Sequence, residues 1–516
     1  MHPQRWGDPA AAAPLPESTR GLVELAFGGI KDASATDSYA LPATLPDALL
    51  DGLRSVVGAD QVLTDDDVRR LRTRGKSTPD LLRARSGDLS DAPDAVVRPG
   101  SHDEVVALIA WAVENEVALV PFGGGTSVTG GLVAARAGYA GVVSLDLIRM
   151  NQLLSVDRES MTATLQPGLR GPEAEALLTE QGLMLGHLPQ SFEFASIGGF
   201  AATRSSGQAS AGYGRFDDMV VRMRVATPIG DLEVGSSPAN AAGPDLRQVV
   251  LGSEGTLGVI TEVTVRVREL PAEKVYEAWQ FESFAAGAAA MRSLAQRDLL
   301  PQVIRLSDEN ETALNLASQS DVGGASTGGC LMIVGHEGAS VADQQARLSA
   351  ELADLGGSSL GEERGRAWAE GRFHAPYLRD SMLDVGVLVE TLETATFWSN
   401  RERLYAAVKT ALETSLGEGT LVLCHISHVY ATGCSLYFTV ATPQGDAPLE
   451  RWLEAKAAAS QAMVDAGATI THHHAVGTDH KPWLAQEIGP VGVAMLQGLK
   501  RAVDPTGVLN PGVLIP

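Results

Sequence analysis

The chain has 516 residues, which is too long for a single hydrophobic core and predicts two or three domains. Its formal net charge is −23 and no basic stripe offsets it, so we do not expect nucleic acid as a partner. The three cysteines have neither zinc-site nor disulfide spacing, and no run of 18 apolar residues could span a bilayer. We expect a cytoplasmic protein that touches a membrane surface at most transiently, to fetch a lipid.

Residues 1–91 are expected to form a partly helical N-terminal extension. The segment up to about residue 40 is rich in alanine, proline and glycine, and we expect it to be extended or poorly ordered. Apolar residues at helical spacing predict helix between Pro46 and Arg74. Gly75-Lys76-Ser77 matches the end of a phosphate-binding P-loop, but Arg70 stands where that motif needs its first glycine. The sequence therefore does not predict a nucleoside triphosphatase.

A strand–helix–strand unit opens the next predicted domain, residues 92–273. Residues 95–99 predict a strand, and Ser101 with Glu104 forms a capping box for the helix that follows. A second strand over residues 117–121 runs into three consecutive glycines. Such a unit commonly supports a phosphate-bearing cofactor. Further short strands are expected over residues 141–145, 162–166, 219–227 and 259–267.

The second half of the chain differs from the first in composition and in predicted secondary structure. Residues 274–455 carry long alanine- and leucine-rich helices between strands and predict a separate α+β cap domain. Residues 456–516 contain a predicted helix over 491–503 and a Pro/Gly-rich tail, which we expect to pack back on earlier structure near the cofactor.

Four separated segments combine glycines with hydroxyl side chains, a composition that lets backbone N–H groups bind a pyrophosphate. The candidates in the first two segments are Pro121, Phe122, Gly123, Gly124, Gly125, Thr126, Ser127, Gln190, Ser191, Phe192, Glu193, Phe194, Ala195 and Ser196. The candidates in the last two are Gly198, Gly199, Thr203, Arg204, Ser205, Ser206, Glu254, Gly255, Thr256, Leu257, Gly258, Val259 and Ile260. Val128 occupies the place of the third Rossmann glycine, so the site must have another architecture.

The order PFGGGTS, QSFEFAS, GGFAATRSSG and LGSEGTLGVITE resembles the FAD-binding domain of the vanillyl-alcohol-oxidase type. From about Val68 to Pro511 the chain resembles the alkyldihydroxyacetonephosphate synthase (alkylglycerone-phosphate synthase) family, with matching motifs in both domains. The resemblance implies an α+β fold: a PCMH-type FAD-binding domain of two α/β subdomains, followed by the cap domain. It also implies FAD as cofactor, and a homodimer is left open because relatives are often dimers.

The resemblance further implies a redox-neutral use of FAD in ether-lipid synthesis. An acyl-dihydroxyacetone phosphate loses its fatty acid while attached to flavin N5, and a fatty alcohol takes its place. Tyr437 would be the proton donor and acceptor, and Arg305 would be needed for activity. Arg379 would contact the lipid-like phosphate substrate, and the catalytic histidines His472, His473 and His474 would shape the polar end of the site.

Tyr437 and Arg379 also have a plainer interpretation. Tyr437 lies in an apolar strand pattern and could be part of a core, and Arg379-Asp380 could be a surface ion pair worth little. As a base near neutral pH, a buried Tyr437 would need nearby cations to lower its pKa. Thr126 and Ser127 stand where relatives with covalent flavin carry histidine or cysteine, so we expect non-covalent FAD.

Several positions depart from the synthase pattern and keep a rival open. Gln190 stands where the family usually has aspartate, and His425 where it has arginine. The rival is an FAD-linked dehydrogenase of D-2-hydroxy acids, whose Gly-Asp-Gly-Asn-Leu-His and Glu-His-Gly motifs hold a divalent metal. The corresponding acids are missing here, so we expect no metal, although His425 and His428 leave a histidine-only site open. A flavin-bearing module without turnover is a third alternative.

Overall fold

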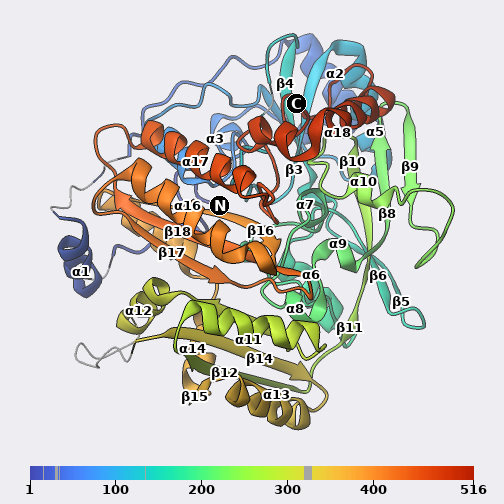
Figure 1. Ribbon diagram of the computed structural model, residues 1–516. Helices are drawn as coiled ribbons and strands as arrows, with labels where there is room; N and C mark the ends of the chain where they lie inside the picture. Colours follow the sequence, from blue (N-terminus) through green and yellow to red (C-terminus); the bar gives the residue numbers. More distant parts are fainter. Residues whose placement is uncertain (16, 29–32, 34, 134, 319–327) are drawn as a thin grey trace.

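The computed structural model describes residues 1–15, 17–28, 33, 35–133, 135–318 and 328–516. The described chain forms three main β-sheets with helices around them (Figure 1). Parts of the predicted N-terminal extension (16, 29–32, 34) and of the predicted cap domain (319–327) lie outside the described residues.

The first sheet holds the strand–helix–strand unit that the sequence predicts. Its order is β1-β2-β4-β3, with β2, β4 and β3 parallel and β1 antiparallel at the edge. The hydroxyl of Ser101 accepts the amide of Glu104 at 3.2 Å and caps α5, as predicted. The other half of the predicted capping box differs, because the carboxylate of Glu104 accepts the amide of Gly100. The elements of this region are α1 (Glu17–Phe27), α2 (Asp47–Val57), β1 (Val62–Leu63), α3 (Asp66–Arg70), α4 (Thr78–Arg85), β2 (Ala95–Val97), α5 (His102–Asn115), β3 (Val117–Phe122) and β4 (Gly141–Asp146).

The second sheet is antiparallel, in the order β5-β6-β10-β8-β9. Helix α7 begins at Ser196, whose hydroxyl accepts the amide of Gly199, and it packs with the sheet in one apolar core. The elements here are β5 (Leu153–Asp157), β6 (Thr162–Leu165), α6 (Gly171–Thr179), β7 (Leu183–Met184), α7 (Ile197–Thr203), α8 (Ser210–Tyr213), α9 (Phe216–Met219), β8 (Val220–Thr227), β9 (Gly230–Val234), α10 (Arg247–Val250), β10 (Val259–Arg266) and β11 (Arg268–Glu269).

The third sheet has seven antiparallel strands in the order β15-β12-β14-β13-β17-β18-β16. Helices α11, α13, α16 and α17 lie along it (Figure 1). Its elements are β12 (Glu273–Phe281), α11 (Phe284–Gln296), β13 (Val303–Ser307), α12 (Glu309–Ser318), β14 (Cys330–Gly338), α13 (Ala342–Asp354), β15 (Ser358–Gly361), α14 (Glu363–Gly371), α15 (Ala375–Asp384), β16 (Val387–Phe397), α16 (Arg401–Leu416), β17 (Leu421–Ile426), β18 (Gly433–Pro443), α17 (Pro448–Asp465) and α18 (Lys481–Val503).

Alternation along these strands decides which side chains reach the site. Leu436 and Phe438 are fully buried in the core under the helices, so Tyr437 between them points to the opposite face of the sheet. Arg305 is placed in the same way by the buried Ile304 and Leu306. The third sheet thus presents an apolar face to its helices and a polar face to the first two sheets.

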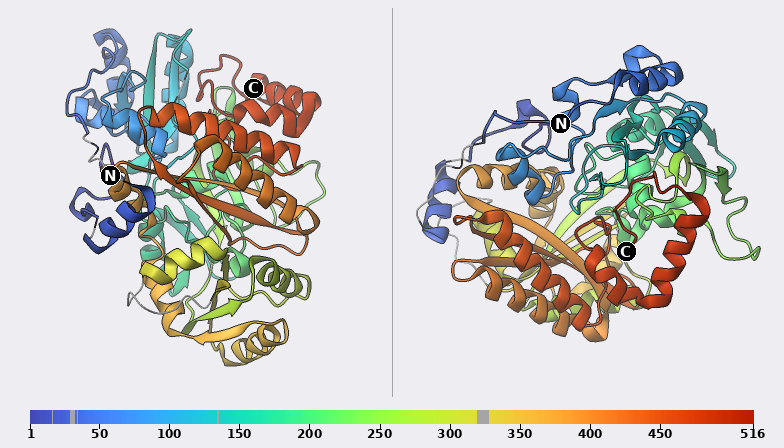
Figure 2. Two further views of the ribbon diagram at one scale, coloured as in Figure 1. Left: turned by 60° about the vertical axis from the view of Figure 1, so that its left-hand side comes forward. Right: turned by 90° about the horizontal axis from the view of Figure 1, so that it is seen from above.

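The C-terminal segment leaves the third sheet and returns to the first. Helix α18 is broken at Gly489, where φ is 71°, just before Pro490, so the predicted helix over 491–503 is its second part. Beyond it, Leu509 forms a bridge with Leu119 of β3. Figure 2 shows this segment, in red, lying beside the part of the molecule that contains the first two sheets in both views.

Two local expectations differ from the structure. The helix expected between residues 46 and 74 is two helices, α2 and α3, with β1 between them. The first residues of the chain are not loose: Trp6 is buried, packs edge-on against Phe194 and donates its amide to Asp380. Among the described residues, no helix is long and apolar enough to cross a bilayer.

Candidate active site

A cavity of about 430 Å³ lies between the polar face of the third sheet and the glycine loops of the FAD-binding half. This volume lies within the range of ligand pockets in proteins. Side chains from all three sheets and from the C-terminal segment line it. Residues more than 300 positions apart in the sequence, such as Gly124 and Tyr437, therefore face the same space.

The glycine loop after β3 has no room for side chains. A Cβ on Gly123 would lie 2.1 Å from the hydroxyl oxygen of Ser196, and one on Gly124 would lie 1.8 Å from the carbonyl oxygen of Phe194. Gly125 has a φ of +70°, which favours glycine. The first two predicted loops therefore pack backbone against backbone, which leaves a bare cradle of the kind that a diphosphate needs.

Most of the predicted cofactor residues come together at this cavity. Those that line it are Pro121, Phe122, Gly123, Gly124, Gly125, Thr126, Ser127, Gln190, Ser191, Ala195, Ser196, Gly198, Gly199, Thr203, Ser205, Ser206, Glu254, Gly255, Gly258 and Ile260. Those that lie outside its lining are Phe192, Glu193, Phe194, Arg204, Thr256, Leu257 and Val259. Arg204, for example, turns away and donates to the carbonyl oxygen of Leu251 at 3.0 Å.

Glu254 ties the fourth loop to the C-terminal segment. Its carboxylate accepts the amides of Val476 and Gly477 at 2.9 to 3.0 Å. Burial raises the pKa of Glu254 to about 7, against the effect of these two hydrogen bonds. The side-chain amide of Asn510 donates to the carbonyl oxygens of Gly131 and Glu254, so the C-terminal segment closes one side of the cradle.

On the sheet side, Arg305 is held by a buried carboxylate that sequence reasoning missed. Arg305 Nη2 donates to Glu311 Oε1 at 2.7 Å, and His425 Nδ1 lies 3.2 Å from the same oxygen. Burial alone would raise the pKa of Glu311, but His425 and Arg305 outweigh it and lower the pKa to about 2. Glu311 is therefore ionised and fixes the guanidinium at the cavity.

Tyr437 lines the cavity between the arginine and the histidines. Its ring stacks on His425, with centroids 4.8 Å apart. Burial raises the pKa of Tyr437 to about 12; Arg305 acts in the opposite direction without reversing it. The cations near Tyr437 do not make it a phenolate near neutral pH, so the side chain begins as a proton donor.

The histidine triplet closes the opposite wall. His473 and His474 line the cavity, whereas His472 lies behind them, with its Nε2 2.6 Å from the hydroxyl of Tyr430. Burial lowers the pKa values of all three, to about 3 for His472 and His474 and about 4 for His473. The triplet therefore presents neutral imidazoles, which can accept a proton.

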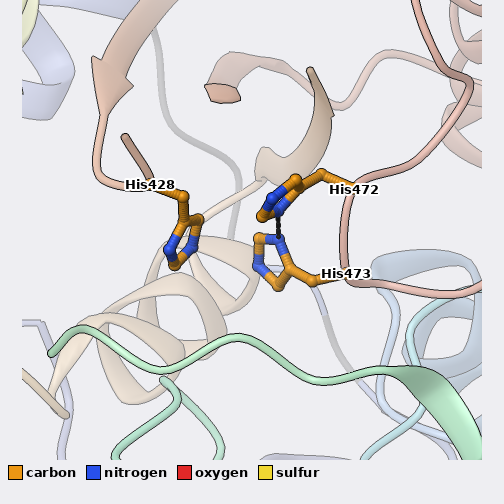
Figure 3. Close-up of side chains that lie close together, drawn as sticks. All are labelled: His428, His472 and His473. Carbon is orange, nitrogen blue, oxygen red and sulfur yellow. Dashed lines mark hydrogen bonds between the residues drawn. The ribbon is translucent and has the colours of Figure 1, made fainter. Parts of the chain in front are cut away.

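His428, His472 and His473 form a group whose possible metal-ligand atoms lie within 4.8 Å of one another (Figure 3). The rings of His428 and His472 stack with centroids 4.9 Å apart, and Nδ1 of His428 is hydrogen-bonded to the hydroxyls of Ser206 and Ser210. An imidazole binds a metal in its own ring plane, so stacked rings favour a hydrogen-bonded network over a shared ion. The absence of a metal stays a prediction.

Arg379 and Lys76 bring positive charge to the cavity. Arg379 forms a buried ion pair with Asp380, 3.0 Å from Nη2, and its Nη1 donates to the carbonyl oxygen of Lys76 at 2.6 Å. Burial lowers the pKa of Lys76 to about 8. Lys76 comes from the tripeptide that resembles a P-loop. The position of this tripeptide just before the FAD-binding domain was the one sequence feature that could have indicated Lys76 as a cavity residue. Trp6 also lines the cavity, and no sequence feature indicated it.

Comparisons with known proteins place the chain in a family. The profile of the FAD binding domain matches residues 93–235, and that of the C-terminal domain of FAD linked oxidases matches residues 270–514. An alkyldihydroxyacetonephosphate synthase of Trypanosoma brucei brucei is 34% identical over 92% of this chain and 82% of its own. One of Dictyostelium discoideum is 35% identical over 89% and 79%. A mitochondrial D-lactate dehydrogenase of Arabidopsis thaliana is 28% identical over 96% and 84%.

Solved structures agree with these relatives. A crystal structure of an alkyldihydroxyacetonephosphate synthase superimposes with a TM-score of 0.84 at 30% identity, covering 99% of this chain and 98% of the other. A 4-ethylphenol oxidase of Gulosibacter chungangensis, at 16% identity and a TM-score of 0.72 over 92% and 98%, shares the fold alone. The fold and FAD as cofactor, both expected from the sequence, are confirmed. The chain belongs to the alkyldihydroxyacetonephosphate synthase family of FAD-dependent enzymes.

Proposed function

We propose that this enzyme exchanges the acyl group of an acyl-dihydroxyacetone phosphate for a fatty alcohol, which would make it an alkyldihydroxyacetonephosphate synthase like the relatives that carry that name. The observation that carries the proposal is the convergence on one cavity of the FAD loops, Tyr437, Arg305 and the histidines. In the net reaction the ester C–O bond to the reacting carbon breaks and the fatty acid leaves. A C–O bond to the alcohol oxygen forms in its place, and no electrons are gained or lost overall.

The roles of the residues follow from their surroundings. The glycine cradle would hold the diphosphate of FAD, and bound FAD supplies an electron-accepting ring nitrogen, N5, for the exchange. Arg379, which lines the cavity, would receive the substrate phosphate, because a guanidinium can bind a phosphate through two N–H donors at once. Arg305, held by Glu311, would orient the carbonyl oxygen of dihydroxyacetone.

Proton transfer needs one donor and one acceptor near the reacting carbon. Tyr437 enters as a neutral phenol, whereas His473 and His474 enter as neutral imidazoles, with ring centroids 6.2 and 5.5 Å from that of Tyr437. These imidazoles accept the proton that leaves the reacting carbon, directly or through the hydroxyl of Tyr437. Tyr437 then returns a proton to that carbon.

The direct test is product formation. FAD-loaded enzyme is incubated without oxygen with acyl-dihydroxyacetone phosphate and a fatty alcohol labelled with ¹⁸O, and we expect the label in the ether product by mass spectrometry. Tyr437→Phe should retain FAD and lose about 10² to 10⁴ in kcat, the usual contribution of a general acid or base. An inactive wild-type enzyme, or a fully active Tyr437→Phe, contradicts the proposal.

The alternative is an FAD-linked D-2-hydroxy-acid dehydrogenase, which the D-lactate dehydrogenase relative and the three clustered histidines favour. It would need a metal at His428, His472 and His473, where the stacked rings fit an ion poorly. Rapid bleaching of the flavin absorption by D-lactate, with no ether formed, would establish this alternative.

The remaining parts of the proposal concern the setting. FAD is held without a covalent bond. The reason is that Thr126 and Ser127 line the cavity at the glycine-loop positions where a histidine or cysteine would be needed for attachment. The enzyme works in the cytoplasm on ether-lipid precursors, and its fatty substrates bring it transiently to a membrane surface. A homodimer is part of the same proposal.

A further inference from the structure

A buried carboxylate lies directly behind the histidine triplet. Glu393 is on β16, and its side chain is 0% exposed. Its Oε1 accepts the hydroxyl of Thr471 at 2.6 Å and the amides of His474 and His473 at 2.9 and 3.1 Å. Its Oε2 accepts the amide of His472 at 2.7 Å. Every backbone N–H of the triplet therefore ends on one side chain.

Three consecutive amides pointing at one anion form a backbone nest, and such charge-assisted hydrogen bonds are strong. Burial would raise the pKa of Glu393, but the three histidines and Thr471 outweigh it and hold the pKa far below its ordinary value. Glu393 is thus a charged group at any pH at which the enzyme works. The irregular backbone over 472–474 exists because it is wrapped around this carboxylate.

The position of Glu393 in the sheet relates the histidines to Tyr437. In the antiparallel pair of β16 and β18, Glu393 lies directly opposite Tyr437. Side chains at paired positions emerge on the same face of a sheet. The carboxylate and the phenol are therefore fixed to one sheet. The loop that Glu393 holds consequently lies at a fixed distance from Tyr437.

The charges around the triplet give Glu393 a second effect. It raises the pKa of all three histidines, against burial, which is the largest cause and lowers them. Arg215, which precedes α9, also lowers the pKa values of His472 and His473, and Lys456 of α17 lowers that of His474. Other titratable groups that interact with the triplet are His187, His425, His428, Tyr430 and Tyr437.

We propose that Glu393 is a positioning residue: it holds the triplet at a fixed distance from Tyr437 and balances the charge of a proton that arrives on His473 or His474. The inference rests on the proposed function, in which that proton comes from the reacting carbon and returns to it. No other chemical group is required, because the proton stays within the site.

The test is Glu393→Gln in the FAD-loaded enzyme. Glutamine keeps the size and one acceptor oxygen but removes the charge and places an amide NH₂ against backbone donors. We expect kcat to fall by on the order of 10²-fold or more, as for other groups that orient a catalytic histidine, with KM changed by less than about threefold. Loss of the anion lowers the histidine pKa values, so the acidic limb of the kcat–pH profile should move to lower pH. A purely structural defect would scale the profile without moving it.

The matched control is Glu337→Gln. Glu337 is also a buried carboxylate with two hydrogen-bond donors, the hydroxyls of Tyr213 and Tyr276, but it lies outside the cavity lining. We expect this variant to keep the wild-type kcat and pH profile. A wild-type kcat in Glu393→Gln, or an unmoved pH profile, overturns the inference.

Two further measurements keep the outcome decisive. Should Glu393→Gln not fold, Thr471→Val removes one hydrogen bond to the same carboxylate; a lower kcat at constant KM supports the inference and an unchanged kcat overturns it. Histidine titration by NMR in wild type and variant does not depend on turnover. If the wild type forms no ether, the proposed function fails, but the role of Glu393 is still tested. Different pKa values of His473 and His474 in wild type and in Glu393→Gln support that role, and identical values refute it.

Discussion

Replacing Glu311 by glutamine tests whether the Arg305 site is held by charge. Glu311 has an ordinary pKa of 4.5 that falls to about 2 in the folded protein, and its side chain is 9% exposed. A shift of about 2.5 units at 1.36 kcal/mol per unit amounts to about 3 kcal/mol of stability near neutral pH. Because the folded pKa is depressed, this stability is complete above pH 4.5 and is lost as the pH falls through about 2.

The assay is urea unfolding of the FAD-loaded protein at pH 7 and pH 3, followed by tryptophan fluorescence. Glu311→Gln should be less stable than wild type by about 3 kcal/mol at pH 7 and by about half as much at pH 3. The control, Glu413→Gln, removes an exposed partner of Lys409 and should change stability by less than about 0.5 kcal/mol. If Glu311→Gln is as stable as wild type at pH 7, or destabilises equally at both pH values, the reasoning is refuted.

Three other predictions concern the cofactor and the histidines. Gly124→Ala places a methyl group 1.8 Å from the carbonyl oxygen of Phe194. FAD affinity measured by flavin fluorescence should therefore fall at least tenfold, as expected if one charge-assisted hydrogen bond is lost. Gly498→Ala, where nothing lies within 4 Å, should bind FAD normally, and unchanged binding in both variants would contradict the cradle. Precipitation with acid should leave the yellow colour in the supernatant, because Thr126 and Ser127 offer no covalent attachment; a yellow pellet would show otherwise. Dialysis against a strong chelator should leave activity intact and elemental analysis should find no stoichiometric metal, whereas activity restored only by zinc or manganese would place an ion among His428, His472 and His473.

The sequence predicted the parts of the site that depend on local pattern. The strand–helix–strand unit and the glycine loop follow from hydrophobic periodicity and the needs of the backbone, and the structure contains them within a residue or two. Arg305 and Tyr437 were expected at the site only from the family resemblance. In the structure each alternates with core residues along its strand and so lines the cavity.

The partners of these residues could not be predicted, because they come from distant segments. Glu311 and Glu393 look like ordinary acids in the sequence. Only the fold brings Glu311, in α12, to His425 of β17, and only the pairing of β16 with β18 places Glu393 opposite Tyr437. Burial, which raises the pKa of Tyr437, is likewise a property of the assembled sheet. The irregular backbone over residues 472–474 could not be predicted for the same reason, since a carboxylate 79 residues away binds the amide of His472.

The return of residues 504–514 to the first sheet has a consequence for biosynthesis. Asn510 bridges Gly131 and Glu254, so the cradle lacks a wall until that asparagine has been translated and has left the ribosome. An N-terminal half emerging first can form its sheets, yet it must wait for a segment made almost 400 residues after the glycine loop. Flavin loading is therefore expected to be post-translational, and nascent chains stalled before residue 510 should remain colourless in the presence of FAD.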